Sequence, residues 1–260
     1  MEYPTAVILD WIANYFWPFT RISAMMMVMT VFGARFVSSR IRLYLALAVT
    51  FAVMPSIPAV PKEIELLSLA GFITTAEQLI IGVSMGMVTQ FVIQTFVLLG
   101  QILAMQSSLG FASMVDPANG QNTPVLGQLF MLLATLFFLI TDGHLKMINF
   151  VVISFKTLPI GSGQLTVIDF RSLATWLGVM FKAALSMSLS GIIALLTVNL
   201  SFGVMTRAAP QLNIFSLGFA FALMIGLLLC WYILIGMFGH YDLHWMRAET
   251  QICSLIRLDC

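Results

Sequence analysis

Two histidines have the clearest spacing for chemistry in this chain: His240 and His244 lie one helical turn apart, with Asp242 between them. Imidazole nitrogens at positions i and i+4 can share one metal ion, as they do in zinc sites. Such a site also needs a third ligand and outer groups that orient the first ligands, and neither is evident near this pair. Because His and Tyr side chains are also common where an apolar segment leaves a membrane, we expect no metal ion and no other cofactor.

Other catalytic arrangements are missing from the sequence. It has no glycine-rich phosphate loop, no nucleophile elbow and no Cys–His pair. The cysteines, Cys230, Cys253 and Cys260, lack a metal-binding spacing, and an odd number gives no disulfide framework. We therefore expect three inert thiols and a protein that is not an enzyme.

The composition assigns the class of protein. The chain is 60% hydrophobic and 9% charged, with a mean hydropathy of +1.00, whereas a soluble domain is about 25% charged. These values predict an integral membrane protein. The net charge of +1 gives no basic patch that would bind nucleic acid. The acidic Glu2 and Asp10, in place of a basic leader, predict that no signal peptide is removed.

About six or seven apolar segments can be drawn at roughly 20 residues per span. As a helix, the segment at 70–106 would be about 50 Å long, against a hydrocarbon core of about 30 Å. Either such helices tilt and project from the bilayer, or protein partners cover them. Two short segments are separated only by Asp142-Gly143-His144 and predict one broken helix or a re-entrant hairpin. The segments lie near residues 11–34, 43–61, 70–106, 125–141, 143–159, 173–202 and 213–239.

Charged residues inside these segments are functional candidates by default. Each can instead be a buried ion pair or a side chain that reaches the membrane surface, and for Lys182 we favour the surface. The basic residues do not assign sides of the membrane, because successive connections all carry one. The charged residues concerned are Asp10, Arg21, Glu77, Asp142 and Lys182.

Small and polar residues form stripes on three predicted helices. Such residues let helix backbones approach closely and hydrogen-bond between helices. One stripe can serve packing within the chain, but three exceed what six or seven helices need, which favours packing against other subunits. The stripes are Gln90, Gln94 and Gln101; Ala183, Ser186, Ser190, Ala194, Thr197 and Ser201; and Gly218, Ala222 and Gly226.

A turn-rich loop at about 106–124 separates two apolar runs. Its first part is apolar, its one charge is Asp116, and Asp116-Pro117 and Asn119-Gly120 are strong turn signals. Irregular backbone at membrane depth is tolerated only where it is buried in protein or lines a cavity. The loop's exit predicts a helix that begins at Pro124, with Thr123 as its N-cap. A second break, around Arg207, Pro210 and Asn213, precedes the last helix.

Several runs of residues resemble the FliR/SctT family of type III secretion export-gate proteins, and within it the flagellar biosynthetic proteins FliR. The similarity extends over nearly the whole chain in length and hydropathy, and the motifs stand in the family's order. The runs are Gly110 to Pro117, Pro124 to Gln128, Leu139 to His144, Asn199 to Gly203, and Arg207 to Phe215.

The resemblance implies an all-α polytopic membrane protein of long helical hairpins, with one integral membrane domain over residues 1–260. In this family FliP-like and FliQ-like subunits join the chain in a helical, cone-like export gate, with which FlhB-like and FlhA-like proteins associate. The gate lies in the bacterial inner membrane, in contact with lipid, within the flagellar basal body. Unfolded flagellar proteins pass through it.

The resemblance also implies that the loop plugs the closed pore. An apolar constriction blocks ions and water by dewetting, and flexible apolar side chains can seal it without a fixed geometry. Met114 stands where the family often has a second aromatic residue. The implied sealing residues are Phe111 and Met114, supported by Gly110, Ala112, Ser113 and Val115, with bends at Asp116, Pro117, Asn119 and Gly120.

Two other functions compete with this one. A secondary transporter of a small solute would use broken helices that frame a site at the bilayer midplane, but no internal repeat is apparent. A membrane enzyme would need convergent His and carboxylate side chains, and only the pair at His240 and His244 is present.

Overall fold

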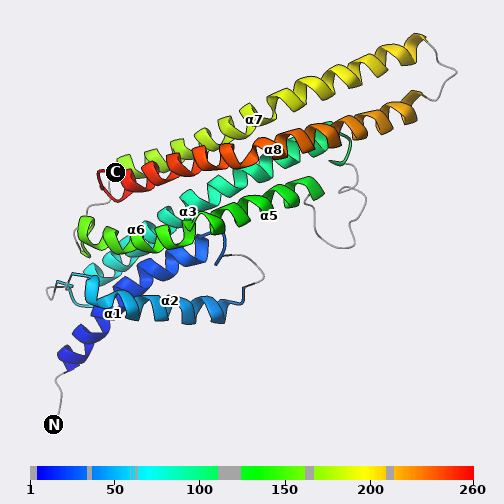
Figure 1. Cartoon of the computed structure of the whole chain (residues 1–260). Helices are drawn as coiled ribbons and strands as arrows, with labels where there is room; N and C mark the ends of the chain where they lie inside the picture. The colour runs from blue at the N-terminus through cyan, green and yellow to red at the C-terminus, as the bar shows by residue number, and fades with distance from the viewer. Residues whose placement is uncertain are drawn as a thin grey trace. The chain divides into compact units, whose positions relative to one another are not determined.

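A computed structural model describes residues 5–33, 37–58, 60–61, 64–110, 124–161, 167–208 and 214–260, without the side chains of 5–10, 167–170 and 214–217. Within these ranges the regular structure is entirely helical (Figure 1). This result confirms the prediction of an all-α chain. The elements are α1 (Thr5–Val28), α2 (Ser39–Val53), a short 3-10 turn η1 (Met54–Ser56), α3 (Leu69–Gln106), α5 (Val125–Ile140), α6 (Gly143–Thr157), α7 (Val167–Ala208) and α8 (Ile214–Leu255).

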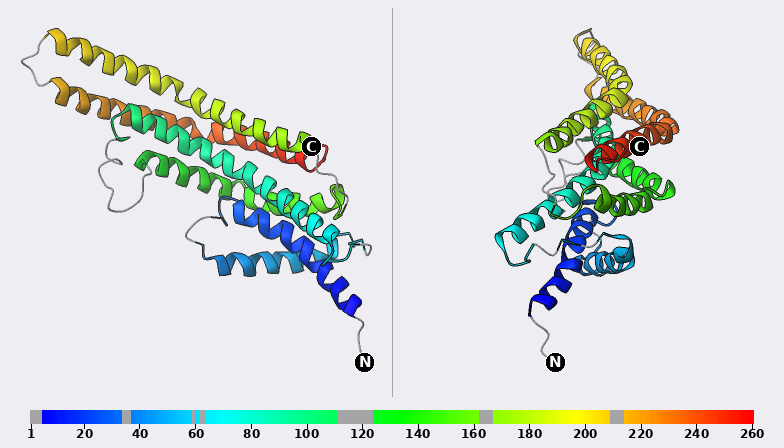
Figure 2. Two further views of the ribbon diagram at one scale, coloured as in Figure 1. Left: turned by 180° about the vertical axis from the view of Figure 1, so that it is seen from behind. Right: turned by 90° about the vertical axis from the view of Figure 1, so that its left-hand side faces the viewer.

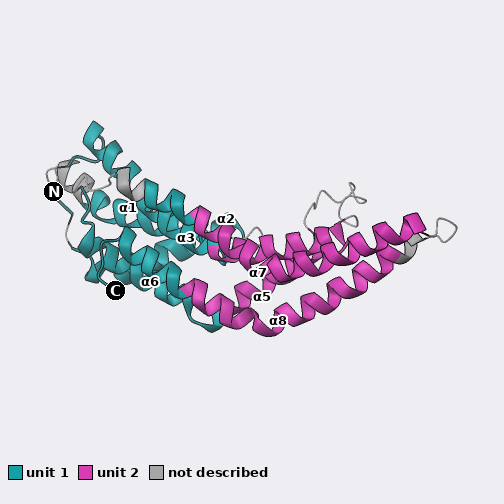
Figure 3. Cartoon of the chain, turned by 90° about the horizontal axis from the view of Figure 1, so that it is seen from above, with its two compact units in different colours: residues 1–91, 138–176, 246–260 teal, residues 92–137, 177–245 magenta. Residues whose placement is uncertain are grey.

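The helices divide into two compact units (Figure 3). Unit 1 comprises residues 1–91, 138–176 and 246–260, and unit 2 comprises residues 92–137 and 177–245. The long helices α3, α7 and α8 each contribute one part to unit 1 and another to unit 2. Each unit therefore has its own packing, built from segments that are distant in the sequence.

In unit 1, α1 packs closely on the first part of α3, and α2 packs on α1. Gly86 on α3 permits the contact, since a Cβ there would lie 2.7 Å from the carbonyl oxygen of Met25. Gly82, one turn earlier, meets the backbone of Arg21 and the side chain of Ala24 in the same way. Small residues at this spacing let two apolar helices approach backbone to backbone.

In unit 2, α5 packs on the second part of α3, and α7 and α8 form an antiparallel hairpin (Figure 2). A Cβ on Gly100 of α3 would lie 2.8 Å from the carbonyl oxygen of Leu126. The hairpin closes through the rings of Phe202 and Phe221, whose centroids are 5.5 Å apart. Around Phe96 and Phe137, the rings of Phe238, Tyr241 and His244 add a further aromatic cluster.

The long helices exceed a membrane span, as the apolar segment at 70–106 predicted. At about 1.5 Å per residue, α7 and α8, with 42 residues each, are about 63 Å long. Among the described residues three helices are long and apolar enough to cross a membrane, or four if α5 and α6 form one broken span. The fold thus agrees with the predicted polytopic membrane protein.

The helix bounds agree with the broken pair of segments predicted around Asp142 and correct the last predicted segment. The pair on either side of Asp142 forms two helices, α5 and α6, bent by 62°, and Asp142 itself takes the left-handed conformation with φ of 55°. The last segment, predicted at 213–239, continues as helix to Leu255. Hydropathy falls at His240, but the helix continues because Tyr241 and Trp245 are buried in unit 2 and Ala248 and Ile252 are buried in unit 1.

Candidate functional site

The predicted plug loop falls largely outside the described residues. Gly110 is described and half-buried at the end of its first stem. Residues 111–123 are not described, and they include the proposed sealing and bending positions Phe111, Ala112, Ser113, Met114, Val115, Asp116, Pro117, Asn119 and Gly120. The structure therefore describes the two stems that carry the loop, and both belong to unit 2.

The first stem ends through two serines. Ser107 is fully buried, and its hydroxyl donates to the carbonyl oxygen of Leu103 at 2.8 Å and, more weakly, to that of Ala104 at 3.3 Å. Such back-bonding competes with the helical pattern. Ser108 follows with φ of 64°, in the left-handed region that terminates helices. The Ser107-Ser108 pair is therefore a local signal for the end of α3, and an analysis of hydropathy alone does not detect it.

The first stem is also held by α8. A Cβ added to Gly226 would overlap the side chain of Ser107, so a glycine is needed at this contact. Ala222, one turn earlier on α8, is buried as well. The stripe of Gly218, Ala222 and Gly226 therefore packs within the chain, which is the arrangement that we expect of a single stripe, and it gives no contact surface for another subunit.

The second stem begins at Val125 rather than at Pro124, the predicted first helical residue. The carbonyl oxygen of Pro124 accepts from the amide of Gln128 at 3.2 Å, which makes Pro124 the residue that flanks the helix. Leu126 and Gly127 then lie directly against Gly100 of α3. The two stems are thus fixed to each other one turn into α5.

The connection between the stems is long, with 18 residues between the end of α3 at Gln106 and the start of α5 at Val125. Helix α3 continues for six residues beyond Gly100 to Gln106, about 9 Å along its axis. Gly100 contacts α5 in the first turn of that helix. Residues 107–124 could reach roughly 60 Å if fully extended. Loops of this length inside compact domains usually carry function.

The second predicted break lies at the tip of the α7–α8 hairpin. Arg207 is exposed in the last turn of α7, where a cation is favourable beside the free carbonyl groups. Helix α8 begins at Ile214. Pro210 and Asn213 lie outside the described residues.

The polar stripes have different surroundings. On α3, Gln90 accepts a hydrogen bond at 3.0 Å from Thr30, which lies just after α1 in unit 1, whereas Gln94 is exposed and Gln101 is half-buried in unit 2. On α7 the hydroxyl residues of the stripe are exposed in the described chain, although Ala183 is buried and Ala194 half-buried. The exposed residues are Ser186, Ser190, Thr197 and Ser201.

Arg21, which the sequence marked as a functional candidate because it is charged within an apolar segment, is buried in unit 1. The guanidinium of Arg21, with no exposed surface, donates to Gln78 Oε1 at 2.8 Å, to the carbonyl oxygen of Ser154 at 2.9 Å and to that of Leu158 at 2.9 Å. It also donates to Ser154 Oγ at 3.0 Å and lies 4.3 Å from the ring centre of Phe155. Arg21 therefore caps the end of α6 and fixes this helix to α1 and α3.

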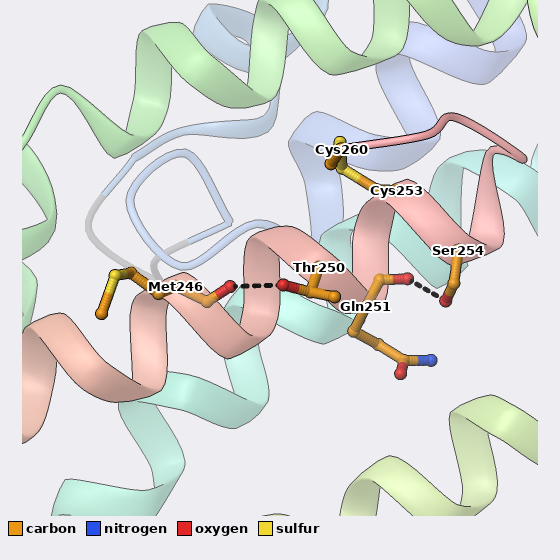
Figure 4. Close-up of a disulfide and its surroundings, with 6 residues drawn as sticks. All are labelled: Met246, Thr250, Gln251, Cys253, Ser254 and Cys260. Atoms are coloured by element: carbon orange, nitrogen blue, oxygen red, sulfur yellow. Dashed lines mark hydrogen bonds between the residues drawn. A yellow bond between two sulfur atoms is a disulfide. The ribbon is translucent and has the colours of Figure 1, made fainter.

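Around the histidine pair, as elsewhere in the described part of the chain, no three His, Cys, Asp or Glu side chains cluster. His240 is exposed, whereas His244 is buried against the ring of Phe96. The expectation of three inert thiols is wrong for two of them, since Cys253 and Cys260 form a disulfide (Figure 4). Cys230 is free and buried.

Comparison with known proteins gives one consistent result. The model of the bacterial export proteins, family 1, matches residues 12–248. The flagellar biosynthetic protein FliR of Escherichia coli K12 is 38% identical over 219 residues, covering 84% of this chain and 83% of that protein. The FliR protein of Pectobacterium carotovorum is 36% identical over 220 residues, or 85% of this chain and 84% of its own length. The FliR protein of Aquifex aeolicus is 29% identical over 210 residues, or 80% of each chain.

Proposed function

The chain belongs to the bacterial export proteins, family 1, and we propose that it is a pore-forming subunit of a flagellar type III export gate. Membership of this family makes it a membrane component of flagellar protein export. The finer proposal is that it joins FliP-like and FliQ-like subunits in the inner membrane, at the flagellar basal body. FlhB-like and FlhA-like proteins would contact the assembled gate, through which unfolded flagellar proteins pass.

The observation that carries the proposal is the mismatch between helix length and covered surface. Only 33% of the most apolar window of α7 and 22% of that of α8 is buried within the chain. These helices are about 63 Å long, about twice the hydrocarbon core of about 30 Å. Exposed large apolar side chains extend along α7 from Leu177 to Met205 and along α8 from Phe219 to Met246, about 40 Å in each helix. Because the hydrocarbon core covers only about 30 Å, this surface supports additional packing against other subunits.

The exposed hydroxyl stripe of α7 supports the same reading. Ser186, Ser190, Thr197 and Ser201 are exposed in the described chain, and hydroxyl and small side chains favour close helix contacts in membranes. Thr197 and Ser201 donate to carbonyl oxygens one turn earlier on α7, so their hydroxyl groups are satisfied and a neighbouring helix can pack over them without a desolvation cost.

The plug role rests on the loop between α3 and α5. Its stems are held at Gly100, Ser107 and Gly226, and 18 residues connect the end of α3 to the start of α5. We propose that Phe111 and Met114 close the pore, with Gly110, Ala112, Ser113 and Val115 beside them. Asp116-Pro117 and Asn119-Gly120 would turn the loop back toward Pro124.

Ion conductance of the assembled complex tests the plug. The double variant Phe111→Ala, Met114→Ala removes both large apolar side chains, and we expect it to leak ions, because a wider and less apolar constriction stays wetted. The matched control is Gln121→Ala, Asn122→Ala in the same loop, which should stay closed. A double variant that assembles and remains as tight as the control would refute the plug.

Assembly is tested separately. The chain should co-purify with FliP-like and FliQ-like subunits, and native mass spectrometry should give one defined stoichiometry. A monodisperse monomer recovered in the presence of those subunits would contradict the gate. The 62° break between α5 and α6 is the one feature that suits a secondary transporter, and solute uptake by the chain alone in liposomes would favour that function instead.

A further inference from the structure

The residues that follow α8 fold back over the end of the helix. The amide of Arg257 donates to the carbonyl oxygen of Ser254 at 3.3 Å, and that of Leu258 to the carbonyl oxygen of Cys253 at 2.9 Å. This pair of hydrogen bonds is the Schellman motif. It brings residues 256–260 alongside the last turn, where Cys260 reaches Cys253 to form the disulfide (Figure 4).

The turn is not one that the sequence favours by itself. Arg257 has φ of 56°, a conformation that glycine adopts readily and that a residue with a side chain adopts at a cost. Thiols joined around this turn oppose that cost, because the covalent bond holds the two ends together whatever the local preference.

The end of α8 is also anchored to two other helices of unit 1. Glu249 accepts from Lys146 of α6 at 2.7 Å, and Gln251 donates to Ser172 of α7 at 3.4 Å. Ile252, Cys253 and Ile256 are almost fully buried, whereas Cys260 is exposed. Cys253 is therefore in a fixed position, and Cys260 is the thiol that a reagent or an enzyme can reach.

We propose that Cys253 and Cys260 are an oxidation site for a thiol–disulfide oxidoreductase, and that this end of α8 lies on the periplasmic side of the inner membrane. Structural disulfides form and persist in the bacterial periplasm and are rare in the cytosol. The inference concerns sidedness and does not depend on the plug. It assigns a side of the membrane to the end of α8, which the positions of the basic residues do not assign.

The reaction is a two-step exchange with the disulfide of that oxidoreductase. The thiolate of the exposed Cys260 attacks one sulfur of the oxidant, forms a mixed disulfide and releases the other sulfur as a thiolate. The thiolate of Cys253 then attacks the Cys260 sulfur and displaces the oxidant. The chain loses two electrons and two protons, and the oxidant leaves as a dithiol.

Counting reactive thiols tests the oxidation. Cells that express the full chain are quenched with acid, and the denatured protein is treated with a maleimide that carries polyethylene glycol. We expect one adduct, at Cys230, without reduction, and three adducts after reduction. Cys253→Ser should give two adducts with or without reduction, and so should Cys260→Ser. Three adducts in most unreduced wild-type chains would overturn the proposal.

A membrane-impermeant phosphine reductant tests the side. When it is added to intact spheroplasts before denaturation, the count should rise from one adduct to three. A count that stays at one in spheroplasts would overturn the periplasmic placement. Cells that lack the periplasmic thiol–disulfide oxidoreductase provide an independent test. Their protein should give three adducts without any reductant. A single adduct in these cells would also contradict the placement.

Discussion

Arg21 offers the sharpest test of how unit 1 is held together. Its guanidinium makes four hydrogen bonds, to Gln78, to both oxygens of Ser154 and to Leu158, and none of these acceptors is a carboxylate. Two of the acceptors are carbonyl oxygens at the end of α6, where a cation also interacts favourably with the helix dipole. Removal of the side chain would leave several buried acceptors without this donor.

The expected loss is large for one residue. A buried acceptor left unsatisfied costs about 1–3 kcal/mol, and a buried cation over an aromatic ring contributes up to about 2 kcal/mol. Removing the charge also removes its own desolvation penalty, so these contributions do not simply add. We expect Arg21→Ala to lower the free energy of unfolding by about 3–5 kcal/mol, a value typical of breaking a buried charged network.

Thermal unfolding of the purified chain in detergent measures this loss. For a chain of this size about 4 kcal/mol lowers Tm by roughly 8–16 °C. Trp17 lies one turn before Arg21 on α1, and its indole donates a hydrogen bond to Thr75 of α3. Its fluorescence therefore reports on the same packing. Arg21→Lys keeps the charge but not the planar fork, so its Tm should fall between those of Arg21→Ala and wild type.

The matched control is Arg40→Ala, since Arg40 is exposed at the start of α2, and surface substitutions stay within about 0.5 kcal/mol. If Arg21→Ala changed Tm no more than Arg40→Ala does, the guanidinium would not cap α6 in the folded protein, and the reasoning would be refuted.

Two further predictions concern the stem of the loop in unit 2. Gly226→Ala should destabilise by about 1–3 kcal/mol because its methyl group overlaps the buried Ser107, whereas Gly239→Ala, with open space around it, should stabilise by up to about 1 kcal/mol; equal Tm values for the two variants would contradict the contact. Ser108→Gly should raise stability by about 1 kcal/mol because glycine tolerates φ of 64°, and thermal unfolding that shows a loss would indicate that the serine side chain holds the turn.

Several features were predictable because they depend on neighbours along the chain. Apolar runs long enough to form helices predicted α3, α5 and α6 to within a few residues, since hydropathy and helical hydrogen bonding are both local. The same rule failed for α8, which continues through the polar residues after His240. There the helix is maintained by tertiary packing of Tyr241 and Trp245 in unit 2 and of Ile252 in unit 1, which an average of hydropathy along the chain does not include.

The candidate site divides in the same way. Turn signals and motifs located the connection between α3 and α5 and the break near Arg207, because turns depend on the types of a few adjacent residues. The sequence could not say that Gly226 packs against Ser107, or that Gly100 packs against the start of α5. These contacts join residues that are distant along the chain, and one small-residue stripe looks like another until its partner is known.

By itself, the sequence determined that this is an all-α membrane protein with helices longer than a bilayer span and a turn-rich loop between two of them, because composition and periodicity set hydration and local hydrogen bonding. Only the tertiary structure decided which polar groups are satisfied. It showed that Arg21 donates hydrogen bonds to carbonyl oxygens at the end of α6, that Cys253 is bonded to Cys260, and that Ser107 packs against α8. Each of these outcomes depends on the distance between groups in space, which spacing along the chain does not specify.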